Sequence, residues 1–172
     1  MAMNTQTTDN ELITAPVPRG KGWKLDVVSD KVVGPACITM FRLMRDSPGE
    51  MYMLLAKDYT IPVSVTKSAE DLVTKQYPDS YRAACESVTY QSTGPVTING
   101  QVWWQANFTL TLKDAEKTVL EKVERVCCIG DHVLVLSYEG KPKDVMRWKV
   151  YTEDWIAGVS FKTLNDSRIT GA

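Results

Sequence analysis

The sequence predicts an α+β domain built on an antiparallel sheet of about six strands that is covered by helices. The segment Gln101–Lys113 has the clearest strand pattern, because its even-numbered positions from 102 to 112 are all apolar and its odd-numbered positions are mostly polar. The Asn99-Gly100 pair before it is a strong hairpin signal. Apolar residues at helical spacing between positions 72 and 85 predict a covering helix.

The turn at Asn99-Gly100 sets the register of this hairpin. A two-residue loop would place Val96 and Ile98 on the polar face of the sheet. A turn one residue longer pairs Ile98 with Val102 and Val96 with Trp104, all on the core face. We therefore expect the longer, bulged turn.

Five further segments have strand-like patterns: Ala36–Arg45, Met51–Tyr59, Val88–Ile98, Lys117–Ile129 and Val133–Tyr138. Turn residues separate the first two of these strands and also the last two. Lys117–Ile129 also fits a helical stripe. We predict a strand there, because a hairpin to Val133–Tyr138 satisfies its backbone groups most simply.

Two helices are expected. The residues from Ser68 to Asp71 resemble a capping box, and Pro78 either kinks the helix behind it or begins a second short one. The segment Lys143–Phe161 reads as a C-terminal helix with a break near Tyr151-Thr152.

Residues 22–164 are expected to form a single domain between a flexible polar N-terminal tail (1–21) and a short C-terminal tail (165–172). Twenty basic and 21 acidic residues leave a net charge of −1, without the basic excess typical of nucleic-acid-binding proteins. No run of eighteen apolar residues predicts a membrane span. The N-terminus lacks the apolar core of a signal peptide, so we expect a cytoplasmic protein, with the cell envelope as the alternative if a leader was removed.

No constellation of residues identifies a reaction, and we expect neither an enzyme nor a bound cofactor or metal. The four cysteines form no metal-binding spacing and are expected to be buried, and His132 is expected to be a solvated turn residue. Ser64 and Lys67 match the Ser-x-x-Lys pattern of penicillin-binding enzymes without its companion motifs, and they remain the enzymatic alternative together with a reactive cysteine. Four neighbouring charged residues are expected to form a solvated face of their strand: Glu121, Lys122, Glu124 and Arg125.

The order of the elements resembles the PsbP-like superfamily, which includes photosystem II extrinsic proteins, a Ran-binding nuclear-import factor and bacterial DcrB-like proteins. The residues that carry the resemblance are Gly22-Trp23, the Ile98-Asn99-Gly100 turn leading into Val102-Trp103-Trp104, the Val126-to-Tyr138 hairpin and the Trp148–Phe161 helix. The resemblance implies an α/β/α sandwich that binds proteins without catalysis. One bacterial branch, the Eag chaperones of type VI secretion, cradles apolar effector helices. This chain is similar in size, but its polar N-terminal segment is long and no motif maps onto that branch's groove.

We therefore expect a non-catalytic protein-binding module, such as a chaperone or adaptor for an apolar segment of a partner like a secretion-system effector. Self-association into a homodimer without the partner is a further expectation. Two alternatives are a small apolar-ligand carrier, with a cavity lined by Trp104 and Phe108, and an accessory lipoprotein of the PsbP/DcrB type in the cell envelope.

Aromatic residues suggest where a partner would bind. The chain has five tryptophans, and Trp103 lies on the polar face of its strand, where an exposed ring would be a typical anchor for a protein partner. The alternative is that a helix covers this face and buries Trp103. The residues expected to bind the partner are Trp103, Gln105, Asn107, Trp148 and Trp155.

Overall fold

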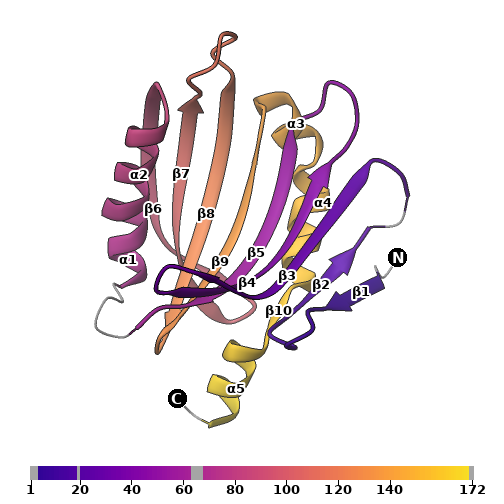
Figure 1. Cartoon of the computed structure of the whole chain (residues 1–172), viewed down its shortest axis with the longest axis vertical. Helices are drawn as coiled ribbons and strands as arrows, with labels where there is room; N and C mark the ends of the chain where they lie inside the picture. The colour runs from indigo at the N-terminus through magenta and orange to yellow at the C-terminus, as the bar shows by residue number, and fades with distance from the viewer. Residues whose placement is uncertain (1–3, 19, 63–67, 171–172) are drawn as a thin grey trace.

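The computed structural model describes residues 4–18, 20–62 and 68–170 and contains two antiparallel sheets (Figure 1). Seven strands form the large sheet in the order β3-β4-β5-β9-β8-β7-β6, and three form the small sheet in the order β1-β2-β10. The large sheet comprises β3 (Trp23–Val33), β4 (Ala36–Arg45), β5 (Tyr52–Thr60), β6 (Ser87–Ile98), β7 (Gln101–Thr111), β8 (Val119–Ile129) and β9 (His132–Gly140). The predicted fold class is confirmed, and Lys117–Ile129 contributes a strand as expected.

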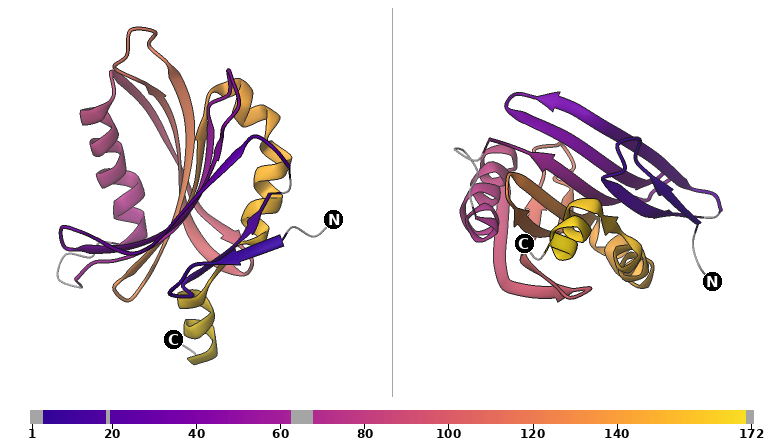
Figure 2. Two further views of the ribbon diagram at one scale, coloured as in Figure 1. Left: turned by 45° about the vertical axis from the view of Figure 1, so that its right-hand side comes forward. Right: turned by 90° about the horizontal axis from the view of Figure 1, so that it is seen from below.

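Helices cover both faces of the large sheet (Figure 2). On one face, α1 (Ala69–Asp71), the π-helical η2 (Leu72–Gln76) and α2 (Tyr77–Ala84) follow one another and pack over β6, β7 and β8. On the other face lie α3 (Pro142–Arg147), α4 (Lys149–Gly158) and the small sheet, and α5 (Lys162–Thr170) ends the chain. Among the described residues, no helix is both long and apolar enough to cross a membrane.

Local sequence explains where these helices begin and break. The Ser68 hydroxyl accepts a hydrogen bond from the Asp71 amide at 3.1 Å, so the predicted helix cap is present. Pro78 lies in the first turn of α2, where a missing N–H is tolerated. The predicted break in the C-terminal helix occurs at Trp148 (φ −97°, ψ 11°), three residues before the expected position.

The predicted register of the β6–β7 hairpin is wrong. Asn99 and Gly100 both have positive φ, 50° and 78°, as a two-residue type I′ loop requires. Ile98 consequently pairs with Gln101 and Val96 with Trp103, and the bulge lies further along β6, between positions 92 and 94. The prediction failed because it assumed a single apolar face, whereas this sheet has a core on each side.

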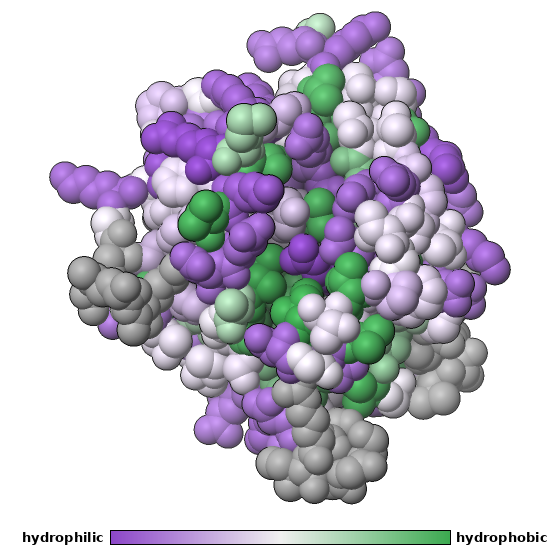
Figure 3. Space-filling model, turned by 180° about the vertical axis from the view of Figure 1, so that it is seen from behind, coloured by the Kyte–Doolittle hydropathy of each residue, from purple (hydrophilic) through white to green (hydrophobic). Residues whose placement is uncertain are grey.

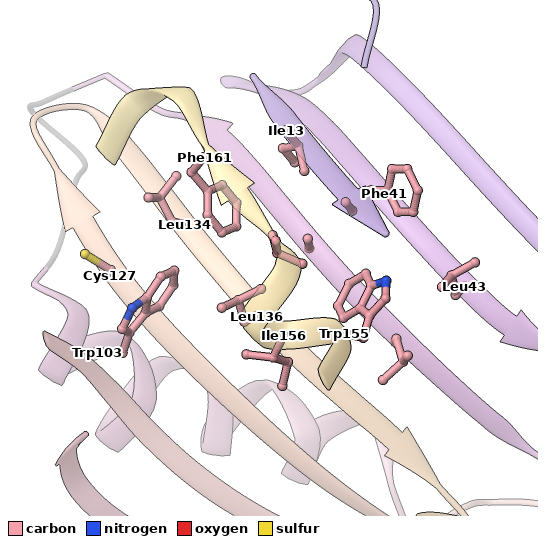
Figure 4. Packing of buried hydrophobic residues seen from close by; sticks show 14 of the residues in the cluster. Ile13, Phe41, Leu43, Trp103, Cys127, Leu134, Leu136, Trp155, Ile156 and Phe161 are labelled. Carbon is pink, nitrogen blue, oxygen red and sulfur yellow. The ribbon is translucent and has the colours of Figure 1, made fainter. Parts of the chain in front are cut away.

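Side chains that alternate along β7 point into these two cores in turn. Ala106, Phe108 and Leu110 are buried toward α1–α2, as the even-numbered face predicts, but Val102 is 51% exposed near the hairpin loop. Trp103 points to the opposite side, where its ring lies 5.8 Å from that of Phe161 (Figure 4). The expected alternative for Trp103, burial in a second core, is therefore the correct one.

The N-terminal segment predicted as a flexible tail belongs to the fold. It forms β1 (Asn4–Thr7) and β2 (Ile13–Val17), and β2 pairs with β10 (Ser160–Phe161). Ile13 is fully buried, and the indole Nε1 of Trp155 donates to the carbonyl oxygen of Pro16 at 3.0 Å. The apolar residues of β2 are too few to produce a periodic signal within a polar segment. The C-terminal tail prediction is likewise wrong up to position 170, because α5 continues to Thr170.

Replacing Ile13 by alanine should lower the free energy of unfolding by about 2–5 kcal/mol, because a fully buried aliphatic side chain leaves a cavity. Urea denaturation measures the change. The matched control is Thr5→Ala, an exposed position of β1 in the same small sheet, which should change the value by less than about 0.5 kcal/mol. Equal effects of the two substitutions would show that β2 does not belong to the core.

Candidate functional site

A groove with a volume of about 580 Å³ lies between the α3–α4 helices and strands β8 and β9. We call it the α4 groove. Its floor includes Arg125 and Tyr138, and α3 and α4 form its wall. The lining residues are Glu121, Arg125, Tyr138, Pro142, Lys143, Val145, Met146, Lys149, Thr152, Glu153 and Ile156. Apolar atoms make up most of this lining, and charged groups stand around it, which is the usual composition of a binding pocket.

A second hollow of about 250 Å³, with a more polar lining, lies further along α4. It shares Ile156 with the α4 groove, and Trp103, Leu136 and Phe161 contribute to its lining. Figure 3 shows hydrophobic side chains gathered on the lower central part of this side of the molecule, with polar side chains around them. On this side of the molecule the α4 groove is the mainly apolar hollow, and the second hollow beside it is mixed.

A cluster of aromatic rings around Arg45 fixes the wall of the groove to the sheet. The Arg45 guanidinium lies 4.8 Å from the ring centroid of Trp23 and 4.5 Å from that of Trp148. Trp23 also stacks on Tyr151 at 5.0 Å. Glu50 binds Arg45 at 2.5 Å and Arg147 at 2.7 Å, and this joins α3 to the turn between β4 and β5.

Gly22 permits this arrangement. Its φ of +87° favours glycine, and a Cβ atom here would lie 2.7 Å from a terminal nitrogen of Arg45. The Gly22-Trp23 pair, which carried part of the family resemblance, thus has a physical role: the glycine admits the guanidinium and the indole stacks on it.

Two buried hydrogen bonds hold the same helices against β5. The hydroxyl groups of Tyr52 and Thr152 form one hydrogen bond. In the other, the buried Asp144 carboxylate accepts a hydrogen bond from the Met51 backbone amide at 2.8 Å. Burial raises the pKa of Tyr52 to about 12, so this phenol stays protonated at neutral pH. The wall of the groove is therefore attached at several points.

The floor of the groove carries a polar chain of side chains. The Arg125 Nε donates to the Gln105 Oε1 at 2.8 Å, and the Gln105 Nε2 donates to the Asn107 Oδ1 at 3.1 Å. The Arg125 guanidinium also lies 5.9 Å from the Tyr138 ring centroid. Burial raises the pKa of Tyr138, and the nearby Arg125 charge opposes this shift. The floor thus places one cation beside an apolar wall.

The five residues predicted to bind a partner are only partly at this site. Trp103 and Trp155 are 2% and 0% exposed, so neither ring is the exposed surface anchor that was expected. Gln105 and Asn107 are half-buried and adjoin the groove, and Trp148 belongs to the Arg45 cluster. The role of these three residues in binding stays a prediction.

Sequence reasoning missed the most exposed apolar residues near the groove. Met146 is 80% exposed and lines it, and Val150 on α4 is 72% exposed. The adjacent pair Val145-Met146 offered only a weak signal, because neighbouring helical residues point about 100° apart and a core-facing stripe can still include both.

The opposite face of the sheet has a buried charged cluster under α2. The side chains of Lys122 and Glu124 lie 3.3 Å apart, and the buried Glu124 carboxylate also accepts from the Tyr81 hydroxyl. The predicted solvated strand face is thus wrong, because alternate residues of β8 go to opposite faces: Glu121 and Arg125 line the α4 groove.

Three half-buried methionines lie on the β4–β5 part of the same face as Lys122 and Glu124. Met44 pairs with Met53, and Met40 pairs with Lys57. The main strand contacts of α1, η2 and α2 are with β6, β7 and β8. These methionines form a second candidate contact surface, but α1–α2 contributes no wall to it.

His132 is anchored rather than solvated. Its Nδ1 lies 2.7 Å from the Oδ1 of the buried Asp58, whose Oδ2 accepts from the Thr163 hydroxyl at 2.7 Å. The buried carboxylate therefore joins β9 to α5, and the Thr163 hydroxyl is engaged by Asp58. Among the described residues, no three His, Cys, Asp or Glu side chains form a metal-binding group. Ser64 and Lys67 lie outside the described residues.

Comparisons with known proteins identify the fold and no more. The sequence matches no family model and no curated protein. The solution structure of cyanobacterial PsbP (CyanoP) from Synechocystis sp. PCC 6803 is similar, with a TM-score of 0.55 and 12% identity over 92% of this chain and 91% of that one. The crystal structure of PA94, a protein of unknown function from Pseudomonas aeruginosa, aligns with a TM-score of 0.45 and 10% sequence identity over 90% of this chain and 94% of that one. The similarity to CyanoP confirms the PsbP-like fold, whereas the Eag branch finds no support.

Gly22→Ala should destabilise the protein more than Gly20→Ala. Both glycines have positive φ, so each alanine carries backbone strain of about 1–3 kcal/mol. At position 22 the added Cβ atom would also collide with the Arg45 side chain. At position 20 no other atom lies within 4 Å of the added Cβ, so only the backbone strain remains. Thermal unfolding monitored by tryptophan fluorescence measures both variants. Equal losses of stability would exclude the proposed role of Gly22.

Lys57→Met should raise the free energy of unfolding at neutral pH. Burial lowers the pKa of Lys57 from its ordinary 10.5, and the Glu124 charge offsets only part of this effect, so the folded state disfavours the charged amine. The gain should shrink as pH rises from the lowered folded-state pKa through 10.5, because the amine then loses its charge in the unfolded state as well. Urea denaturation between pH 7 and 10.5 tests this, with the exposed Lys24→Met as control. A gain that does not change with pH would contradict it.

Proposed function

We propose that the protein is a non-catalytic binding module whose α4 groove receives an apolar segment of a partner protein. The observation that carries the proposal is an apolar groove of about 580 Å³ whose lining includes Met146, a side chain that is 80% exposed. Burying such surface is favourable by roughly 25 cal/mol per Å². Contiguous apolar surface of this kind is typical of interaction sites in soluble proteins.

The residues of the groove suit a peptide ligand. Met146 is flexible and polarizable, and such side chains adapt to different apolar partners. Lys143, Lys149 and Glu153 stand at the groove and can orient a bound segment through complementary charge. The lining contains no cysteine, histidine or serine, which favours binding over nucleophilic catalysis.

A small apolar-ligand carrier is the second candidate, because the volume of the groove lies in the range of small-molecule sites. The expected cavity lined by Trp104 and Phe108 does not support it. Phe108 instead packs with Tyr81 at 4.8 Å and Tyr90 at 5.4 Å between ring centroids. Any small ligand would therefore share the α4 groove.

Finer expectations remain proposals. They comprise the identity of the partner as a secretion-system effector, a chaperone or adaptor role, the absence of catalysis, homodimerisation without the partner and location in the cytoplasm or cell envelope. The fold of the similar cyanobacterial PsbP bears on none of them.

Site-specific photo-crosslinking tests the binding role. A photoreactive amino acid at position 146 should form crosslinks to a partner protein in the source cells, whereas the same residue at position 32 should not. Val32 is a matched control, because it is 75% exposed on the loop end of β3 and does not line the groove.

Affinity for the crosslinked partner provides a second readout. Met146→Glu should weaken binding about tenfold or more by placing a charge in an apolar contact, and Val32→Glu should leave it unchanged. Equal crosslinking at both positions, or equal affinity of both variants, would contradict the proposal. A small molecule that co-purifies with the wild type but not with Met146→Glu in native mass spectrometry would favour the carrier instead.

A further inference from the structure

Most cationic side chains that lie against the sheet have a carboxylate partner. Arg42 binds Asp26 at 2.6 Å, Arg45 binds Glu50, and Lys122 binds both Glu124 and Glu139. Arg125 differs from them, because it is half-buried and forms no ion pair with any described residue. An unpaired guanidinium at the floor of an apolar groove is therefore a feature that the fold itself does not explain.

The local contacts orient Arg125 and leave its outer edge unoccupied. Its Nε donates to Gln105, and Asn107 holds the Gln105 amide in turn. The described residues supply no acceptor for the two terminal nitrogens. Two parallel N–H groups of a guanidinium match the two oxygens of a carboxylate, and this pairing is strong where water is partly excluded.

The charges around the groove agree with an acidic ligand group. Lys143 and Lys149 also line the groove without ion-pair partners among the described residues, and Glu121 and Glu153 are the two lining carboxylates. The lining therefore carries one net positive charge. Neither Glu121 nor Glu153 lies within ion-pair distance of Arg125, so this guanidinium remains available.

From these observations we infer that Arg125 binds a carboxylate, and that the apolar segment received by the α4 groove includes an aspartate or glutamate side chain. The inference rests on the proposed function and adds the chemistry of the partner to it. The apolar side chains of the segment contact Met146 and Ile156, and its carboxylate forms a two-pronged pair with Arg125.

A peptide library displayed on phage tests the inference without knowledge of the natural partner. Random twelve-residue peptides are selected on the immobilised full chain and on its Met146→Glu and Arg125→Met variants. Peptides that depend on the groove are those enriched on the wild type and lost on Met146→Glu. We expect them to combine apolar residues with one acidic residue, and we expect the acidic residue to disappear from the peptides selected on Arg125→Met.

Affinities of one selected peptide and its Glu→Gln or Asp→Asn analogue complete the test. The wild type should bind the analogue at least tenfold more weakly than the acidic peptide. The Arg125→Met variant should bind both peptides equally, with an affinity below that of the wild type for the acidic peptide. Arg82→Met is the control, because Arg82 lies on α2 and pairs with Asp79 on the other side of the sheet. The wild-type comparison remains decisive even if Arg125→Met folds poorly.

The outcomes separate the inference from the proposed function. Groove-dependent peptides without an acidic preference, or equal affinity of the wild type for both peptides, would overturn the role of Arg125 and leave the binding module intact. A selection that yields no groove-dependent peptide would overturn both.

Discussion

The Arg45 guanidinium contacts the rings of Trp23 and Trp148, which also contact each other, and this cluster joins the first strand of the large sheet to the helices that form the wall of the groove. Glu50 completes the cluster by binding both Arg45 and Arg147. The α3 helix also packs against β8 and β9, and the groove lies at this junction. The position of the groove follows from where this cluster holds α3 and α4.

The β8 strand supplies both sides of the protein with their charged groups. Lys122 and Glu124 are paired and buried under α2, whereas Arg125 lines the groove without an ion-pair partner among the described residues. Burying an unpaired charge is costly, so a half-buried cation persists most easily where solvent or a ligand can reach it. The contrast within one strand distinguishes a group that stabilises the fold from one that is available for binding.

Local patterns in the sequence predicted the elements well, and long-range contacts account for what they missed. The Ser68 cap, the β4–β5 hairpin and the β8 strand follow from local propensity and turn residues. The burial of Trp103 depends on a second core supplied by residues near position 160, which no local pattern shows, whereas the two-residue loop is the one that Asn99-Gly100 favours locally. The order in the N-terminal segment has the same cause, since β2 is stabilised by pairing with β10.

The site was less predictable than the fold. Gln105 binds Arg125 at the floor of the groove, but the groove itself arises where α3–α4 meets β8 and β9 in space. In the sequence, Met146 is indistinguishable from the core residues of the C-terminal helix, because a sequence does not reveal which side of a short helix faces the sheet.

Methyl NMR of the seven methionines tests most directly which face of the sheet binds a partner. With methyl-labelled methionine and an added groove-selected peptide, the Met146 signal should shift strongly. The signals of Met40, Met44 and Met53, which lie on the opposite face, should stay in place. Shifts confined to those three methionines, with Met146 unchanged, would move the binding surface to the other side of the sheet and contradict a binding role for the α4 groove.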